Sequence, residues 1–386
     1  MLKSILRNKL VKYIALPIIA LVLLVVLGGG WYFSGIIEED ALRVDNTALQ
    51  PSVEVTEIGI DTITLKQIPE AEVEENLSAS AQWGLSDGLN YGRLGAVISD
   101  SDGLVTRQFI SMVGKFEIGD ELYLDRTAFP HDPKIAQGID YSEIIIRSEL
   151  GDIGAWLIAI ATTNQSSETW TIVVHGRTSN RDTGLKLLTD YDYGQALLID
   201  YRNDEGAPAS ESGYYDFGVT EWRDVEATVQ YALDHGAKKI ILAGFSMGGG
   251  LVVNYQLKSE LSAHTVGIIL EAPMLNFGRT IDKGAEERGV PAPITSMAKL
   301  FASIRYGIDW SALDFLSHAN EITVPTLLIH GDADDTVPIE TSIEFAAANP
   351  DLIQFHKFRD TGHVAAWNKN PQLYESLVKE FVAKIR

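Results

Sequence analysis

The sequence predicts an α/β protein with a doubly wound, mostly parallel β-sheet, preceded by an N-terminal transmembrane helix and a β-rich N-terminal accessory region. From residue 141 onward, short apolar runs alternate with amphipathic segments of helical period, which is typical of strands buried on both faces of a parallel sheet. Residues 13–37 carry no charged side chain, and about 20 mostly apolar residues suffice to cross a bilayer. The region between these two parts has weaker strand signals.

Composition excludes several classes of function. The 386 residues carry a formal net charge of −22, which argues against a nucleic-acid partner because phosphate binding needs a basic surface. The chain has no cysteine, which excludes disulfides, thiolate metal sites and a cysteine nucleophile. It also has neither a dinucleotide-binding fingerprint after a first strand nor an H-E-x-x-H motif. We therefore expect no metal and no cofactor.

The N-terminal apolar stretch is flanked by charges of opposite sign. Before it come Lys3, Arg7, Lys9 and Lys12, and after it come Glu38, Glu39 and Asp40. The positive-inside rule predicts a cytoplasmic basic tail at 1–12, a single span at 13–35 that contacts the lipid bilayer, and an extracytoplasmic remainder. A cleaved signal peptide has the same charge layout. The long apolar region and the lack of an A-x-A-like site favour an uncleaved anchor in the cell membrane.

The remainder divides into an accessory part and a larger domain. Residues 36–140 are predicted as a polar linker, to about Gln50, followed by a β-rich region with strand signals at 53–55, 63–65, 96–98 and 104–105. The larger domain covers residues 141–386. Its expected strands include 144–146, 155–158, 171–174, 196–199, 240–242, 266–270, 325–329 and 354–358.

Helical signals separate these strands. Thr220 is placed to cap a helix whose apolar residues recur at the 3.6 period and which ends at Gly236. The chain closes with Leu373, Leu377 and Phe381, spaced by four. Functional sites in such a doubly wound sheet lie at the carboxyl ends of its strands.

One such strand end carries a strong motif. The strand at 240–242 runs into Gly244-Phe245-Ser246-Met247-Gly248 and then into a helical segment. G-x-S-x-G at a sharp turn from strand to helix exposes the serine hydroxyl, and the next backbone N–H, that of Met247, points to where an oxyanion forms. A glycine-rich turn without chemistry is the alternative. The coincidence of strand, turn and helix favours Ser246 as a nucleophile.

A serine nucleophile needs a histidine to take its proton. His363 lies in a loop after the expected last strand and before the last helix, next to Gly362, where it can reach across the sheet edge. His175 also follows a strand and is the strongest rival by position. The remaining histidines lie within strands, helix ends or connections. His363 is therefore the predicted base.

The third residue has to orient His363 and stabilise its positive charge. Asp332, Asp334 and Asp335 all follow the strand that ends at Ile329. Their spacing does not choose among them. Each would complete the chain order Ser, Asp, His.

Residues 141–386 resemble the catalytic domain of the α/β-hydrolase superfamily. The similar motifs are His175-Gly176, residues 200–204, residues 244–248, Asp334-x-x-Val337-Pro338 and Gly362-His363. They look most like the serine-aminopeptidase-like and dienelactone-hydrolase-like branch, including membrane-anchored bacterial members. The resemblance implies Ser246 as nucleophile, Asp334 as acid and His363 as base. It also implies a second oxyanion N–H from Arg177 or Thr178.

The segment at about 276–322 stands where such enzymes carry a cap. Ile294, Met297, Phe301 and Ile304 fall on one helical face within it. Packing against the domain's own core is the favoured interpretation. An apolar wall for a substrate is the functional one. The pocket candidates are Thr178, Phe245, Met297 and Phe301.

These features predict a membrane-anchored serine hydrolase that cleaves a carboxylic ester or a related acyl bond of a small-molecule substrate through an acyl-enzyme. A peptide substrate is the alternative within this class. An aminopeptidase would need an acidic group to bind the substrate ammonium, and no single carboxylate stands out for it. A non-catalytic binding domain on the same fold is a further alternative, but it would not require Ser246, Asp334 and His363 together.

Overall fold

The computed structural model describes residues 13, 15–45, 49–69, 71, 76–159, 168–189 and 194–385. The predicted basic tail at 1–12 lies outside the described residues. Two compact units form: one contains the chain up to Arg43 together with Asn276–Asp314, and the other contains Val44–Leu275 and Phe315–Arg386.

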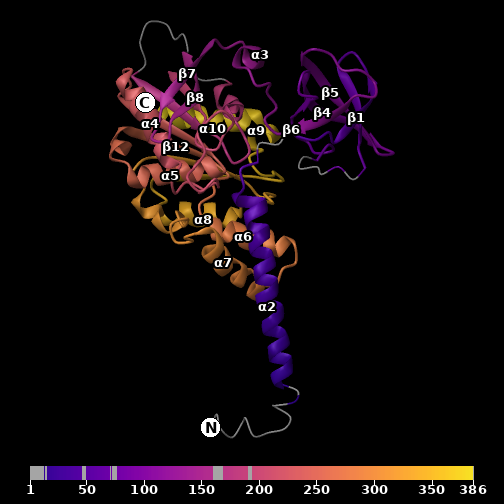
Figure 1. Cartoon of the computed structure of the whole chain (residues 1–386). Coiled ribbons are helices and arrows are strands. Elements are labelled where there is room, and N and C mark those ends of the chain that lie inside the picture. Colours follow the sequence, from indigo (N-terminus) through magenta and orange to yellow (C-terminus); the bar gives the residue numbers. More distant parts are fainter. Residues whose placement is uncertain are drawn as a thin grey trace. The chain divides into compact units, whose positions relative to one another are not determined.

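The second unit contains an eight-stranded sheet with the order β14-β13-β12-β11-β9-β10-β8-β7 (Figure 1). Its strands are β7 (Tyr141–Arg147), β8 (Asp152–Ala159), β9 (Thr169–Val174), β10 (Gln195–Ile199), β11 (Lys239–Phe245), β12 (Thr265–Glu271), β13 (Thr326–Gly331) and β14 (Ile353–Phe358). The strands from β9 to β14 pair in parallel. The first two strands, β7 and β8, pair antiparallel, and β8 joins the sheet at β10.

Helices cover both faces of this sheet. They are α4 (Trp222–Asp234), α5 (Met247–Lys258), α8 (Ile339–Ala348), α9 (Ala366–Lys369) and α10 (Pro371–Ile385), with shorter turns α3 (Pro133–Gln137), η3 (Arg181–Leu188), η4 (Glu260–His264) and η5 (Leu316–Glu321). One core cluster joins η3 and α10 to sheet residues such as Trp156 and Leu198. On the other side α4 and α5 pack against each other and against β9.

The predicted cap of α4 is wrong. The helix begins one residue later, with Glu221 at the N-cap position, and the Thr220 hydroxyl donates to Asp216 instead. The Glu221 carboxylate accepts the backbone N–H groups of Asp216 and Gly218. The turn before the helix is therefore closed by a buried glutamate rather than by a threonine cap.

The weak strand signals of the accessory region correspond to a closed barrel with the order β1-β2-β5-β4-β3-β6. Its strands are β1 (Val53–Ile58), β2 (Thr62–Gln67), β3 (Trp83–Ser86), β4 (Tyr91–Ser101), β5 (Leu104–Val113) and β6 (Glu121–Asp125). Asp102 and Gly103 both have positive φ, 54° and 76°, as a two-residue hairpin between β4 and β5 requires. The buried Arg107 guanidinium donates to the carbonyls of Leu77, Ala81 and Gly95, and burial lowers its pKa to about 10.

The barrel contacts the loop that follows His363. Ala365 packs into the apolar core of the barrel. The side-chain amide of Asn368 donates to the carbonyls of Gln82 and Arg126 over 2.7 and 2.8 Å. The backbone carbonyl of Asn368 accepts the N–H of Gln82. The Asn368 side chain also accepts a bond from the buried Lys186. The accessory region is thereby tied to the sheet domain.

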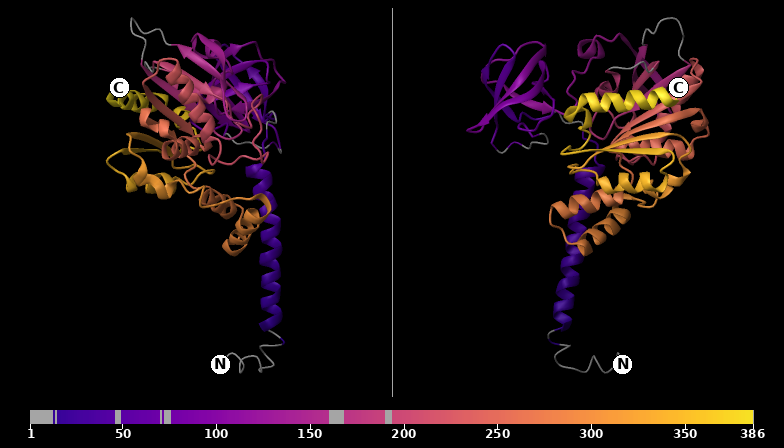
Figure 2. Two further views of the ribbon diagram at one scale, coloured as in Figure 1. Left: turned by 60° about the vertical axis from the view of Figure 1, so that its left-hand side comes forward. Right: turned by 180° about the vertical axis from the view of Figure 1, so that it is seen from behind.

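The first unit consists of α2 (Leu16–Ile37), the π-helical turn η2 (Glu38–Leu42), α6 (Phe277–Glu287) and α7 (Ala292–Tyr306). The polar linker expected from residue 36 therefore starts as helix. The reason is the Glu38 carboxylate, which pairs with Arg43 five residues on at 2.7 and 3.1 Å and closes the wider turn. Within this unit α2 and α7 lie side by side (Figures 1 and 2).

Candidate active site

Ser246 occupies a strained turn between β11 and α5. Its φ and ψ are 50° and −118°, a conformation that costs about 1–3 kcal/mol for a residue with a side chain. Backbone bonds from Ser246 N to Glu271 O and from Met274 N to Ser246 O hold the turn in place. A Cβ at Gly248 would lie 2.3 Å from the carbonyl oxygens of Val174 and His175. The G-x-S-x-G spacing is thus required by close backbone approach.

His363 reaches Ser246 from the loop between β14 and α9. Its Nε2 lies 2.8 Å from Ser246 Oγ, and its Nδ1 lies 2.7 Å from Asp334 Oδ2. The carboxylate can only accept, so Nδ1 carries the hydrogen and Nε2 presents its lone pair to the serine hydroxyl. The geometry brings together the three residues predicted as nucleophile, base and acid.

Asp334 is buried and accepts four hydrogen bonds. Oδ1 accepts the N–H groups of Thr336 and Val337 at 2.9 and 2.8 Å. Oδ2 accepts from His363 and from His330 Nε2, the latter at 3.0 Å. Burial works to raise the pKa of Asp334, but the two histidines outweigh it and hold that pKa well below its usual value. The carboxylate therefore stays charged at neutral pH.

His330 is a part of the site that the sequence did not reveal. It lies near the end of β13, next to Gly331, and is one of the histidines for which the sequence patterns indicated no chemical role. Its Nδ1 lies 2.7 Å from Ser342 Oγ, so the serine hydroxyl can donate to Nδ1 while Nε2 donates to Asp334. His330 and His363 thus both donate to Oδ2 and hold the carboxylate in place.

The two neighbouring aspartates have other partners. Asp332 accepts the N–H of Asp360 at 2.7 Å and lies 3.4 Å from Lys357. Asp335 is exposed and accepts the Thr336 hydroxyl. Of the three aspartates, Asp334 is the one that contacts His363 in the described part of the chain, so the geometry singles it out.

Two backbone N–H groups can serve an oxyanion. Met247 begins α5, and the first N–H groups of a helix have no intrahelical acceptor. Of the two candidates for the second donor, Thr178 has its N–H bonded to the phenolic oxygen of Tyr215; burial and the Asp204 carboxylate raise the pKa of that phenol to about 12. Arg177 is the better candidate, because no such bond engages its N–H within the described part of the chain.

The peptide that carries the Arg177 N–H is fixed through its carbonyl. Gly176 O accepts from Tyr201 Oη at 3.0 Å and from His175 Nδ1 at 2.8 Å. Because the N–H of a trans peptide points opposite to its C=O, these two bonds also set the direction of the Arg177 N–H.

His175, the other histidine considered as the base, takes part in this hydrogen-bond network through both ring nitrogens. Its Nε2 lies 3.0 Å from Asp204 Oδ2, and its Nδ1 faces a carbonyl, so both ring nitrogens must carry hydrogen. Burial works to lower the pKa of His175, but the Asp204 carboxylate outweighs it and raises the pKa above the usual value. A charged His175 is therefore the form that holds the loop.

A family model for the prolyl oligopeptidase family matches residues 185–385, which is 201 of the 386 residues. The chain belongs to the prolyl oligopeptidase family. The matched span contains Ser246, Asp334 and His363 but begins after His175 and Arg177. The serine-aminopeptidase-like branch that the motifs suggested stays a prediction.

Solved structures show the same fold. The esterase Pf2001 of Pyrococcus furiosus, in two crystal forms, is 22% and 23% identical over 67% and 66% of this chain and 95% and 94% of that one, with TM-scores of 0.51 and 0.50. Est1E from Butyrivibrio proteoclasticus is 18% identical over 63% of this chain and 98% of its own, with a TM-score of 0.48. The sheet domain of this prolyl oligopeptidase family member has the α/β-hydrolase fold.

The four predicted pocket residues lie in different places. Phe245 is buried at the end of β11, and Thr178 is exposed in the loop after β9. Met297 and Phe301 contact α2: the Phe301 ring packs edge-on against Trp31 with centroids 5.6 Å apart. Neither interpretation of the apolar stripe, core packing or substrate wall, anticipated this partner.

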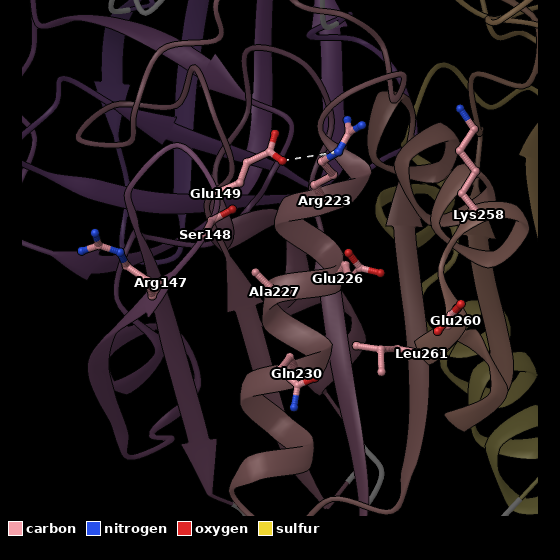
Figure 3. Close-up of a pocket in the computed structure, with 10 residues that line it drawn as sticks. All are labelled: Arg147, Ser148, Glu149, Arg223, Glu226, Ala227, Gln230, Lys258, Glu260 and Leu261. Atoms are coloured by element: carbon pink, nitrogen blue, oxygen red, sulfur yellow. Dashed lines mark ion pairs between the residues drawn. The ribbon is translucent and has the colours of Figure 1, made fainter.

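A surface pocket of about 570 Å³ lies on the unit that contains the eight-stranded sheet, between the β7–β8 turn, α4 and η4 (Figure 3). Its lining mixes charges of both signs, including the Glu149–Arg223 pair at 3.4 Å. None of Ser246, Asp334 or His363 lines it, so it is separate from the proposed site.

One group of side chains in the described residues has the spacing of a metal site: His175, Asp200 and Asp204. The donor set does not fit a cation. Both nitrogens of His175 carry hydrogen, and Asp200 already pairs with Arg181 at 3.0 Å. The cluster serves the hydrogen-bond network of the loop instead.

We predict that Asp334→Asn lowers kcat for ester hydrolysis by roughly 10⁴, because an amide at this position favours the wrong tautomer of His363. Asp335→Asn, at an exposed position, is the matched control and should keep most activity. Steady-state kinetics of the two variants check this. A dead Asp335→Asn beside an active Asp334→Asn would refute the assignment.

We predict that Asp204→Asn lowers kcat roughly tenfold, less than the loss of a whole oxyanion donor. Without the carboxylate the pKa of His175 falls, and the neutral ring donates to Gly176 O more weakly than the charged ring does. Since the charged ring is the stronger donor, the alkaline limb of the kcat–pH profile should move to lower pH in this variant. The exposed neighbour Glu205→Gln is the control. An unshifted alkaline limb in Asp204→Asn would contradict the proposed role.

Proposed function

We propose that this protein is a membrane-anchored serine hydrolase that cleaves a carboxylic ester or a related acyl bond. The family and the fold support a serine hydrolase as the general class of enzyme. The observation that carries the catalytic assignment is the continuous hydrogen-bonded series from Ser246 Oγ through His363 to Asp334, at 2.8 and 2.7 Å. Such an arrangement activates a hydroxyl that is otherwise a weak nucleophile.

The geometry suggests a two-step acyl transfer. Ser246 Oγ attacks the carbonyl carbon while His363 Nε2 takes its proton, and the N–H groups of Met247 and Arg177 stabilise the oxyanion. The C–O bond of the ester breaks, and the departing alkoxide takes the proton from His363. Water then attacks the acyl-enzyme with His363 again as base, which releases the acid and restores Ser246.

A peptide substrate is the second candidate, and membership of the prolyl oligopeptidase family is the observation that favours it. We favour an ester because, in the part of the chain that the structure describes, no carboxylate is identified as a clamp for a substrate ammonium. A non-catalytic binding role would leave the strain at Ser246 and the charge on Asp334 without a use.

The membrane anchor is supported by the surface of α2. The helix is apolar on all sides, and Leu21 and Leu24 are 62% and 68% exposed. Within its own unit, neither α6 nor α7 lies beside the first half of α2 (Figures 1 and 2). A bare apolar helix of 22 residues is long enough to span a bilayer, and in water it would be an aggregation site. We therefore favour a single-pass anchor with the sheet domain outside the cell.

We predict that a fluorophosphonate probe labels the wild-type protein covalently and that Ser246→Ala abolishes the labelling. His363→Ala should also remove it, because members of a triad act as a unit. Circular dichroism of both variants controls for folding. Labelling of Ser246→Ala at the wild-type level would end the proposed mechanism.

We predict that kcat/KM is higher for p-nitrophenyl acyl esters than for aminoacyl and prolyl p-nitroanilides with matched acyl parts. Both series release the same kind of chromophore, so one assay compares them directly. Faster turnover of the anilides would replace the ester proposal by the peptidase alternative and leave the triad intact.

We predict that the full chain sediments with membranes and resists extraction by alkaline carbonate. Protease added outside intact cells should reach the sheet domain, because the basic flank holds the N-terminus in the cytoplasm. A mature protein that begins near Trp31, found by N-terminal sequencing, would show a cleaved signal peptide instead.

A further inference from the structure

We propose that α7, the second helix of the cap-like insertion, lies in the outer interface of the bilayer and is held there by α2. This inference rests on the proposed membrane anchor and adds a second membrane-contacting element, about 260 residues away in sequence. Its partner is the lipid at the boundary between headgroups and acyl chains.

The contact between α2 and α7 is close. A Cβ added to Gly30 would lie 2.5 Å from Met297 Cγ, and one added to Gly29 would lie 3.0 Å from Ile294 Cγ2. Small residues allow such an approach between helices in membranes. Ile37 of α2 also shares a buried apolar cluster with Ala298 and Ala302. Gly29 and Gly30 are thus part of the surface on which α7 packs.

Polar contacts fix the same helix pair. Arg305 donates to the carbonyl of Trp31 at 3.0 Å and to Ser34 Oγ at 2.5 Å, and its guanidinium lies 4.3 Å from the Trp31 ring centroid. Arg288, before α7, pairs with Asp40 at 2.6 Å. Because these bonds involve defined atoms on both helices, they set the register of α7 along α2.

That register gives the depth of α7. At about 1.5 Å per residue, the 15 steps from Leu16 to Trp31 cover about 22 Å, most of the roughly 30 Å of the hydrocarbon core. Trp31 and Tyr32 then lie at the outer interface, where amphipathic rings concentrate. Ile294 and Met297, which face Gly29 and Gly30, lie at the edge of the hydrocarbon, and Phe301 lies level with Trp31.

The outward side of α7 suits this position. Leu300 and Ile304 are 52% and 70% exposed, and at 100° per residue they flank the stripe that meets α2. Residues 289–304 contain a single charge, Lys299, and its ammonium pairs with Asp282 at 2.7 Å. An apolar flank without free charge, continuous with the lipid-facing surface of α2, fits an interfacial helix.

The absence of cysteine from the chain allows a direct test. Single cysteines at Leu300 and Ile304, labelled with an environment-sensitive NBD dye, are compared in full-length protein reconstituted into phosphatidylcholine vesicles with and without nitroxide-labelled lipid. Leu21→Cys reports on the anchor itself. Glu286→Cys, exposed on the charged helix α6, is the control within the same unit. We expect quenching at 300 and 304 at least about twofold stronger than at 286.

The outcomes separate the two proposals. No quenching at Leu21→Cys overturns the anchor. Quenching at Leu21→Cys without quenching at 300 and 304 overturns only the placement of α7. Equal quenching at 286 also overturns that placement, because it would indicate adsorption of the whole cap.

A pair of glycine variants tests the role of α2. In the Ile304→Cys background, Gly30→Leu should reduce quenching at 304, since its side chain collides with Met297. Gly28→Leu is the matched control, because an added Cβ there meets nothing within 4 Å. Leu21→Cys should stay quenched in both. Unchanged quenching at 304 in Gly30→Leu would refute the claim that α2 holds α7.

Discussion

The buried charge on Asp334 is the constraint on which the rest of the proposed site depends. An ionised carboxylate out of water costs several kcal/mol unless it is paired and hydrogen-bonded. Here the turn after β13 supplies two backbone N–H groups, and two histidines supply the others. The charge selects the tautomer of His363, and the tautomer leaves Nε2 free to accept the serine proton. Each of these effects involves only neighbouring atoms, but all of them require the charge on Asp334.

The proposed oxyanion donors depend in a similar way on a buried positive charge. A charged imidazole, His175, and a phenol, Tyr201, hold one carbonyl and thereby aim the N–H on the other side of the same peptide. The accessory barrel contributes in a third way, since Ala365 and Asn368 attach it to the segment just after the base. Residues far from Ser246 in sequence therefore keep the donors and the base in position.

Sequence patterns predicted the features that depend on residues close together in the chain. Ser246 was identifiable because strand, turn and helix meet within a few residues. Asp334 was not separable from Asp332 and Asp335 by the residues alone, since the turn decides which carboxylate points inward. His330 was missed because its role depends on that same turn. Thr220 was predicted as a cap because a threonine before a helix usually accepts its N–H groups, whereas a buried Glu221 closes the turn.

The apolar stripe on α7 shows a different limit of prediction from the sequence. Periodicity predicted that Ile294, Met297 and Phe301 share a face, but it carries no information about a partner that lies elsewhere in the chain. The run Gly28-Gly29-Gly30 was predicted only as part of the membrane span. Its use as a packing surface emerges from the close approach of two helices, which no local pattern encodes.

The separation between Gly30 and Met297 has a consequence for biosynthesis. α2 leaves the ribosome before α7, because 266 residues must be synthesised between Gly30 and Met297. At about 5–20 residues per second, this takes roughly 13 to 50 seconds. During that interval the glycine surface of the nascent helix is uncovered and free to meet other membrane helices, and the barrel and most of the sheet are synthesised before its own partner exists. The first unit therefore cannot be completed until the barrel and most of the sheet have been synthesised, although α2 precedes both in the chain.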